Sequence, residues 1–139
     1  MNSPTEQGTV GLGVAIGYFS SNGYKISIPL NDTQAYDLIV DDGVLKRVQV
    51  KTTRYKRNGK FIVELKTVCA VKSKNTIRYF DSCLVEILFV LTNDGDVYCN
   101  PASEVEAKSS FTLNETYSRW KTKSELAGAL FAAAKHSRA

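Results

Sequence analysis

The most informative stretch of the chain is YDLIVDDGVLKRVQVKT, residues 36–52. It begins as an apolar run with one carboxylate, Asp37, near its start, turns at Asp42-Gly43, and continues as a run that alternates polar and apolar residues. Two such runs joined by an Asp-Gly turn are typical of a β-hairpin. We therefore expect antiparallel strands over residues 36–40 and 45–52.

The second of these strands carries two polar side chains on one face. Because strand side chains alternate in direction, Gln49 and Lys51 point one way and Val48 and Val50 point into the core. The hairpin would bring Asp37 near Gln49 and Lys51. A carboxylate oxygen, an amide oxygen and the Val50 carbonyl form an all-oxygen cradle that suits Mg²⁺. A lysine beside it can hold the attacking water or stabilise charge on a phosphate, although an Asp and a Lys on neighbouring strands also form ordinary surface ion pairs.

The rest of the chain predicts further elements around this hairpin. Ser3, Pro4 and Glu6 have the pattern of a capped helix start, and Asn22-Gly23 has the pattern of a helix end. Residues 72–77 are polar and are expected to form a mobile loop. Strands are expected over residues 24–28, 61–68, 84–91 and 97–99, with turns at Asn58-Gly59 and Asp94-Gly95, and a last helix over residues 124–135.

This order of elements predicts an α/β fold. A mixed central sheet would be flanked by an N-terminal helix and a C-terminal helix. A length of 139 residues favours a single domain over residues 1–139.

The net charge of +4 conceals a basic block in the middle of the chain. Residues 46–81 carry eleven Lys and Arg but two acidic residues, whereas the segments on either side have a net negative charge. A basic block of this kind is typical of a surface that binds a polyanion. The side chains expected to contact such a polyanion are Arg47, Arg54, Lys56, Arg57, Lys60, Lys72, Lys74 and Arg78.

The set Asp37, Gln49-Val50-Lys51 resembles the motif of the PD-(D/E)XK nuclease superfamily. It is most similar to the version in group I intron-associated (homing) endonucleases, in which Gln replaces the usual acid. The similarity covers roughly residues 6–115, and its other matching positions are Gly8, Gly11, Ala15, Asn22-Gly23-Tyr24, Ile28-Pro29-Leu30, Arg78-Tyr79, Asp81, Tyr98 and Pro101-Ala102.

The resemblance implies a restriction-endonuclease-like fold and the hydrolysis of phosphodiester bonds in double-stranded DNA, with Mg²⁺ as cofactor. DNA would then be the polyanion that the basic block binds. It also implies a homodimer or homotetramer. The roles that carry over are catalysis by Asp37, Gln49 and Lys51, and metal binding by Asp37, Gln49 and the Val50 carbonyl.

The chain departs from this family pattern at one position. Many relatives carry a Glu on the first helix, directly after the second glycine, and this chain has Leu12 there. Glu6 is better explained as a capping residue, and Glu64 is another candidate substitute. Two further functions therefore stay open: a non-catalytic DNA-binding protein on the same fold, and an RNA-binding or protein-binding α/β domain.

Other sequence features exclude some classes of protein. The longest apolar run, residues 84–91, contains Glu86 and is well short of the about 20 residues that span a bilayer. The N-terminal residues lack the pattern of a signal peptide, so a cytoplasmic protein without a membrane partner is expected. The single histidine, His136, lies near the C-terminal end, which argues against histidine-dependent nuclease schemes.

Overall fold

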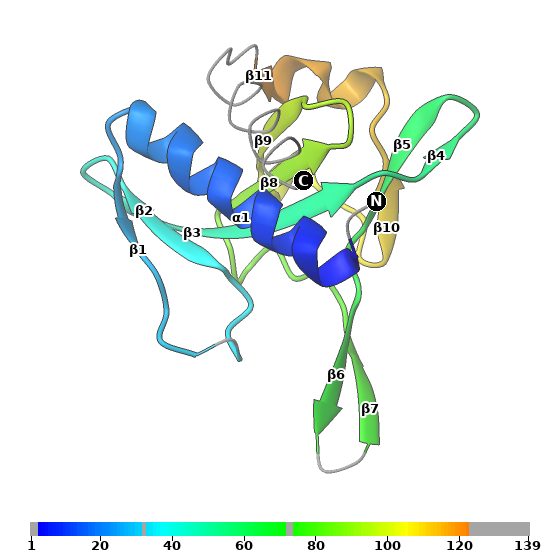
Figure 1. Cartoon of the computed structure of the whole chain (residues 1–139), viewed down its shortest axis with the longest axis horizontal. Helices are drawn as coiled ribbons and strands as arrows, with labels where there is room; N and C mark the ends of the chain where they lie inside the picture. Colours follow the sequence, from blue (N-terminus) through cyan, green and yellow to red (C-terminus); the bar gives the residue numbers. More distant parts are fainter. Residues whose placement is uncertain (1–2, 32, 72–73, 123–139) are drawn as a thin grey trace.

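The computed structural model describes residues 3–31, 33–71 and 74–122. Its centre is a six-stranded sheet in the order β1-β2-β3-β8-β9-β11 (Figure 1). β3 and β8 pair in parallel and the other neighbours pair antiparallel, so the sheet is mixed, as predicted. The bounds are β1 Lys25–Ser27, β2 Leu38–Asp41, β3 Leu45–Thr53, β8 Ile87–Thr92, β9 Val97–Pro101 and β11 Lys121–Thr122.

Smaller elements surround this sheet. A three-stranded sheet has the order β10-β5-β4, and β6 and β7 form a separate hairpin that projects away from the rest of the chain (Figure 1). The remaining bounds are α1 Pro4–Ser21, β4 Lys56–Arg57, β5 Lys60–Glu64, β6 Thr67–Val71, β7 Lys74–Arg78, η1 Ala102–Glu104, β10 Ser110–Thr112 and η2 Glu115–Trp120.

No helix in the described part of the chain is both long enough and apolar enough to cross a membrane.

The capped N-terminal helix is confirmed. The Ser3 backbone N–H donates to Glu6 Oε2 over 2.8 Å, and the Glu6 N–H donates to Ser3 Oγ over 3.2 Å, which completes a capping box. The helix ends at the cap residue Asn22, and Gly23 follows with φ +84°, a conformation that glycine adopts without strain.

α1 packs on one face of the central sheet. Val14, Ala15 and Phe19 of the helix form a core with side chains that alternate along β3 and β8, such as Val48 and Phe89. Gly11 allows the close approach, because a Cβ at this position would overlap the Cγ2 atom of Thr52.

The other face of the sheet covers a second core. Leu88 and Val90, the alternate residues of β8, pack there with three side chains from other elements. These are Val63 of β5, Leu65 directly after β5, and Phe111 of β10. The two faces of β3 are therefore distinct. Val48 faces the helix, whereas Gln49 and Lys51 are the register partners of Leu88 and Val90 and so face the second core.

The three predicted turns are confirmed. The glycines at positions 43, 59 and 95 have φ values of +109°, +77° and +88°, and they connect β2 to β3, β4 to β5 and β8 to β9. Asn58 also has a positive φ, of 52°, as the Asn-Gly hairpin turn requires.

Two strand assignments differ from the sequence prediction. The segment 61–68 is two strands, because the backbone N–H groups of Leu65 and Lys66 both turn to the Ser109 carbonyl. The strand within 84–91 begins only at Ile87, after the turn in which the Leu84 N–H donates to the Asp81 carbonyl.

The loop prediction for residues 72–77 is wrong for the part that the structure describes. Residues 74–78 form β7, which pairs with β6 in an antiparallel hairpin. All five residues of β7 are exposed, so the strand lacks the alternating polarity by which a strand is recognised in sequence. The helix predicted over residues 124–135 lies outside the described residues.

Candidate active site

Asp37 lies at the point where β2 begins beside β3. Its backbone N–H donates to the Val48 carbonyl over 2.8 Å, and its carboxylate Oδ2 accepts from the Val50 N–H over 2.7 Å. The ladder between the two strands starts at the pair Leu38 and Val48. Beyond this pair, the Asp37 carboxylate therefore accepts the hydrogen bond from the Val50 N–H that a backbone carbonyl of the neighbouring strand would otherwise accept.

The Val50 carbonyl faces the same edge as Asp37. The carbonyls of Arg47 and Thr53 accept from Glu86 and Asn93, which lie on the β8 side of the strand. Since backbone groups alternate in direction along a strand, the N–H and C=O of Val50 point to the opposite edge. The hydrogen bond from the Val50 N–H to Asp37 confirms this direction.

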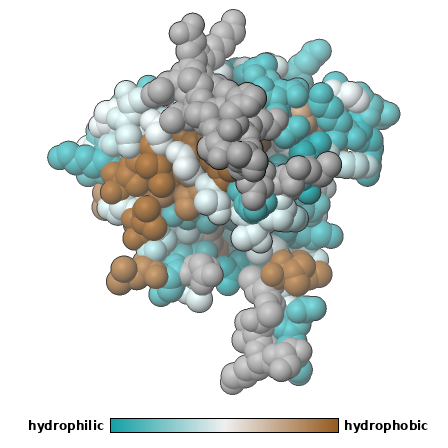
Figure 2. Space-filling model, in the orientation of Figure 1, coloured by the Kyte–Doolittle hydropathy of each residue, from teal (hydrophilic) through white to brown (hydrophobic). Residues whose placement is uncertain are grey.

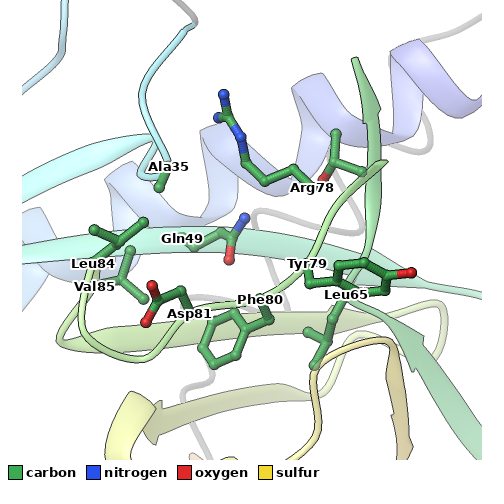
Figure 3. A pocket seen from close by; sticks show the side chains of 10 residues that line it. Ala35, Gln49, Leu65, Arg78, Tyr79, Phe80, Asp81, Leu84 and Val85 are labelled. Carbon is green, nitrogen blue, oxygen red and sulfur yellow. The ribbon is translucent and has the colours of Figure 1, made fainter. Parts of the chain in front are cut away.

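Gln49 and Lys51 come from the face of β3 that is opposite to α1, as the alternation predicted. The Gln49 side chain lines a small cavity between Arg78 and Asp81 (Figure 3). Among the residues that the structure describes, no hydrogen bond engages the Gln49 amide, so its oxygen is available to a ligand. Lys51 Nζ donates to Thr67 Oγ1 over 3.4 Å.

Burial changes the ionisation of the acid and the base in this site. Desolvation raises the pKa of Asp37, against the lowering effects of the Val50 N–H and the Lys51 charge. Desolvation also lowers the pKa of Lys51, against the raising effects of Asp37 and Glu64. Shifts of this kind at an acid and a base that lie together are common at catalytic sites.

The structure places each candidate for the missing helix acid. Leu12 is partly buried and packs against the core under α1, on the face of the sheet opposite to Gln49 and Lys51. The Glu6 carboxylate closes the capping box. Glu64 is exposed at the end of β5, and its charge acts on Lys51.

An all-carboxylate metal site is not present in the described part of the chain. No group of three His, Cys, Asp or Glu residues there could hold a metal ion. Metal binding at Asp37 would therefore draw on neutral oxygens of β3. The candidates are the Val50 carbonyl, at the same strand edge as Asp37, and the Gln49 amide, on the face that also carries Lys51. This donor set fits Mg²⁺, which is held by a few protein oxygens and keeps several waters.

The hairpin of β4 and β5 exposes four of the side chains that were predicted to bind DNA. Arg54, Lys56, Arg57 and Lys60 are all exposed around the Asn58-Gly59 turn. Hydrophilic side chains gather over this hairpin at the upper right of the molecule (Figure 2). Lys56 lies over the Phe61 ring at 4.6 Å and 3.4 Å from Asp94, an exposed ion pair of the kind that contributes little.

The other predicted DNA-binding residues have different surroundings. Arg47 is engaged in a bidentate pair with Glu86, with Nε to Oε2 and Nη2 to Oε1 distances of 3.0 Å each. The pairing raises the pKa of Arg47 and lowers the pKa of Glu86. Arg78 donates to the Thr33 carbonyl over 3.2 Å, and Lys74 is exposed on β7. Lys72 lies outside the described residues.

Thr67 is the site residue that the sequence did not reveal. It lay inside a segment predicted as one continuous strand, and it is 16 residues from Lys51 in the chain. No local pattern marks a threonine as the partner of a distant lysine. The contact follows from the break between β5 and β6, which starts a new strand at Thr67.

Comparison with known proteins identifies a family and a solved structure to which this chain is similar. The sequence profile of the family described as PD-(D/E)XK endonuclease matches residues 2–130. The bacterial homing endonuclease I-Ssp6803I has a similar structure, with a TM-score of 0.66 at 20% identity over 99% of this chain and 100% of that chain. A comparison with curated proteins finds no match. With its mixed sheet, its N-terminal helix and the profile match over most of its length, the chain belongs to the PD-(D/E)XK endonuclease family.

Proposed function

We propose that the protein is a Mg²⁺-dependent endonuclease that hydrolyses phosphodiester bonds of double-stranded DNA, of the site-specific homing type. The observation that supports this most strongly is the open edge of β3. There the Asp37 carboxylate and the Val50 backbone meet, with Gln49 and Lys51 on the adjoining face. The family and the fold agree with nuclease chemistry.

Each residue of the site has a distinct part in this proposal. Asp37, the Gln49 amide oxygen and the Val50 carbonyl would hold the ion, which supplies a Lewis acid and lowers the pKa of bound water. The Val50 N–H holds the Asp37 carboxylate in place over 2.7 Å. The Lys51 ammonium donates to the scissile phosphate or to the attacking water, where a cation stabilises the charge of the transition state.

The proposal extends to assembly and location. Cutting both strands of a duplex requires two active sites, which a symmetric homodimer or homotetramer supplies. The protein would act on DNA in the cytoplasm.

Asp37→Asn is the variant that tests the metal site. We expect it to lose most Mg²⁺-dependent nicking of supercoiled plasmid and to keep DNA binding, because the change removes a ligand charge at almost constant volume. Nicking and duplex affinity are measured for wild type and variant over a range of Mg²⁺ and Mn²⁺ concentrations. Full activity of the variant would show that Asp37 does not hold the catalytic ion.

The placement of Leu12 favours one alternative function. With Leu12 packed in the core, the first helix adds no carboxylate at that position to the one that Asp37 places at Val50, and a site with few charges binds metal weakly. A non-catalytic DNA-binding protein would show this arrangement too. Wild-type protein that binds duplex but nicks no plasmid with either metal would establish the alternative.

The exposed basic hairpin is expected to supply much of the affinity for DNA. Changing Arg54, Lys56, Arg57 and Lys60 together to alanine should weaken duplex binding. It should also flatten the slope of log affinity against log salt by up to about one unit for each lost phosphate contact. Fluorescence anisotropy across a salt series measures both quantities.

A matched control removes the same charge from other surfaces. Lys25, Lys108, Arg119 and Lys121 lie outside this hairpin, on β1, before β10, on η2 and on β11. Their combined change to alanine should leave the salt slope closer to that of the wild type. Equal slopes for the two quadruple variants would mean that the hairpin makes no special contact with DNA.

A further inference from the structure

The β6–β7 hairpin lies at the candidate active site with both of the residues by which it joins the rest of the chain. Thr67, the first residue of β6, is the register partner of Arg78, the last residue of β7. Thr67 accepts a hydrogen bond from Lys51, and both Thr67 and Arg78 line the cavity into which Gln49 projects (Figure 3). The remainder of the hairpin extends away from the sheet (Figure 1).

The Lys51 side chain needs an external partner to fix its ammonium group. A lysine has a flexible four-carbon stem, so holding its ammonium group in one place costs rotamer entropy. On β8 the register partner is the apolar side chain of Val90. The charged groups that act on Lys51 are Asp37 at the start of β2 and Glu64 at the end of β5.

In the part of the chain that the structure describes, the Thr67 hydroxyl is the group that accepts a hydrogen bond from Lys51 Nζ. The distance of 3.4 Å is long, as catalytic hydrogen bonds often are before substrate binds. A charge attracts the ammonium from several directions, whereas a hydroxyl on a paired strand defines one direction.

We propose that Thr67 is the positioning residue for the catalytic lysine. Its hydroxyl, at the start of β6, orients the Lys51 ammonium toward the scissile phosphate. This assignment rests on the proposed nuclease function. It makes Lys51 depend on the same hairpin that carries Lys74 and Arg78.

The kinetic test compares Thr67→Val, which removes the hydroxyl at nearly constant shape, with Thr67→Ser, which keeps it. We expect Thr67→Val to lower the single-turnover cleavage rate constant about tenfold, the range for a hydrogen bond to a charged group. Duplex Kd should stay within about twofold, and Thr67→Ser should restore most of the rate. A valine variant with the wild-type rate, or a serine variant as slow as the valine variant, would overturn the proposal.

Thr112→Val is the matched control for the substitution itself. Thr112 is a strand residue of β10, paired with Ile62, and it belongs neither to the candidate active site nor to the basic β4–β5 hairpin. The Thr112→Val variant should retain the wild-type cleavage rate. An equal loss of rate in Thr112→Val would show that the effect comes from replacing any strand threonine and would remove the support for Thr67.

A second measurement separates this proposal from the proposed function. The NMR order parameter of the Lys51 Nζ group reports how tightly the ammonium is held, with or without nuclease activity. We expect a clear drop in Thr67→Val and none in Thr67→Ser. If wild-type protein cuts no DNA, the nuclease proposal fails while this measurement still decides whether Thr67 holds Lys51. An unchanged order parameter in Thr67→Val would refute that role.

Discussion

Replacing Lys51 by alanine is expected to lower the rate of DNA cleavage by about 10²- to 10³-fold, the usual cost of removing one preorganised charge or donor from a transition state. The loss should appear in kcat rather than in duplex affinity, because the ammonium acts on charge that develops during the reaction. Single-turnover kinetics at saturating protein, together with a binding isotherm, measure the two quantities separately.

Lys46→Ala is the control on the same strand. Lys46 lies near the start of β3, where its Nζ is 3.1 Å from Asp42 in an exposed ion pair at the β2–β3 turn. The variant should cleave at nearly the wild-type rate. If Lys51→Ala and Lys46→Ala behave alike, Lys51 has no special part in the chemistry.

Leu12→Glu is expected to destabilise the protein by about 2–3 kcal/mol and not to improve metal binding. Leu12 packs against the core between α1 and the sheet, so Leu12→Glu would bring a carboxylate into apolar surroundings. The face of β3 that carries Gln49 and Lys51 lies on the other side of the sheet. Thermal unfolding with and without Mg²⁺ measures the loss and any rescue.

Gly13→Glu adds the same carboxylate one residue later, where a Cβ would have no atom within 4 Å. This variant should keep or slightly raise the melting temperature, because a glycine inside a helix costs about 0.5–1 kcal/mol relative to alanine. A stable Leu12→Glu protein whose melting temperature rises with Mg²⁺ would place the helix acid at the metal after all.

Features with a local cause could be predicted from the sequence. The capping box of Ser3 and Glu6 and the glycines at positions 23, 43, 59 and 95 depend on neighbours within a few residues, and the structure confirms all of them. The direction of Gln49 and Lys51 followed from strand alternation, which is also a local rule. The pairing of β2 with β3 then brought Asp37 to Val50.

Features with a long-range cause could not be predicted in this way. β7 is exposed along its whole length and is held by backbone pairing with β6, so its side chains carry no pattern of a strand. Arg47 looked like any other member of the basic block, and its pair with Glu86 joins residues 39 positions apart. The contact between Lys51 and Thr67 likewise depends on where the chain leaves β5.

The central claim is that Asp37, Gln49 and Val50 together hold a divalent cation beside Lys51. Anomalous diffraction from crystals that contain Mn²⁺ and a DNA duplex tests it most directly. We predict one strong peak at about 2 Å from an Asp37 carboxylate oxygen, the Gln49 amide oxygen and the Val50 carbonyl oxygen, the distance of ion ligands of this size. A duplex-bound crystal with its Mn²⁺ peak elsewhere in the protein, or with none at Asp37, would contradict the account.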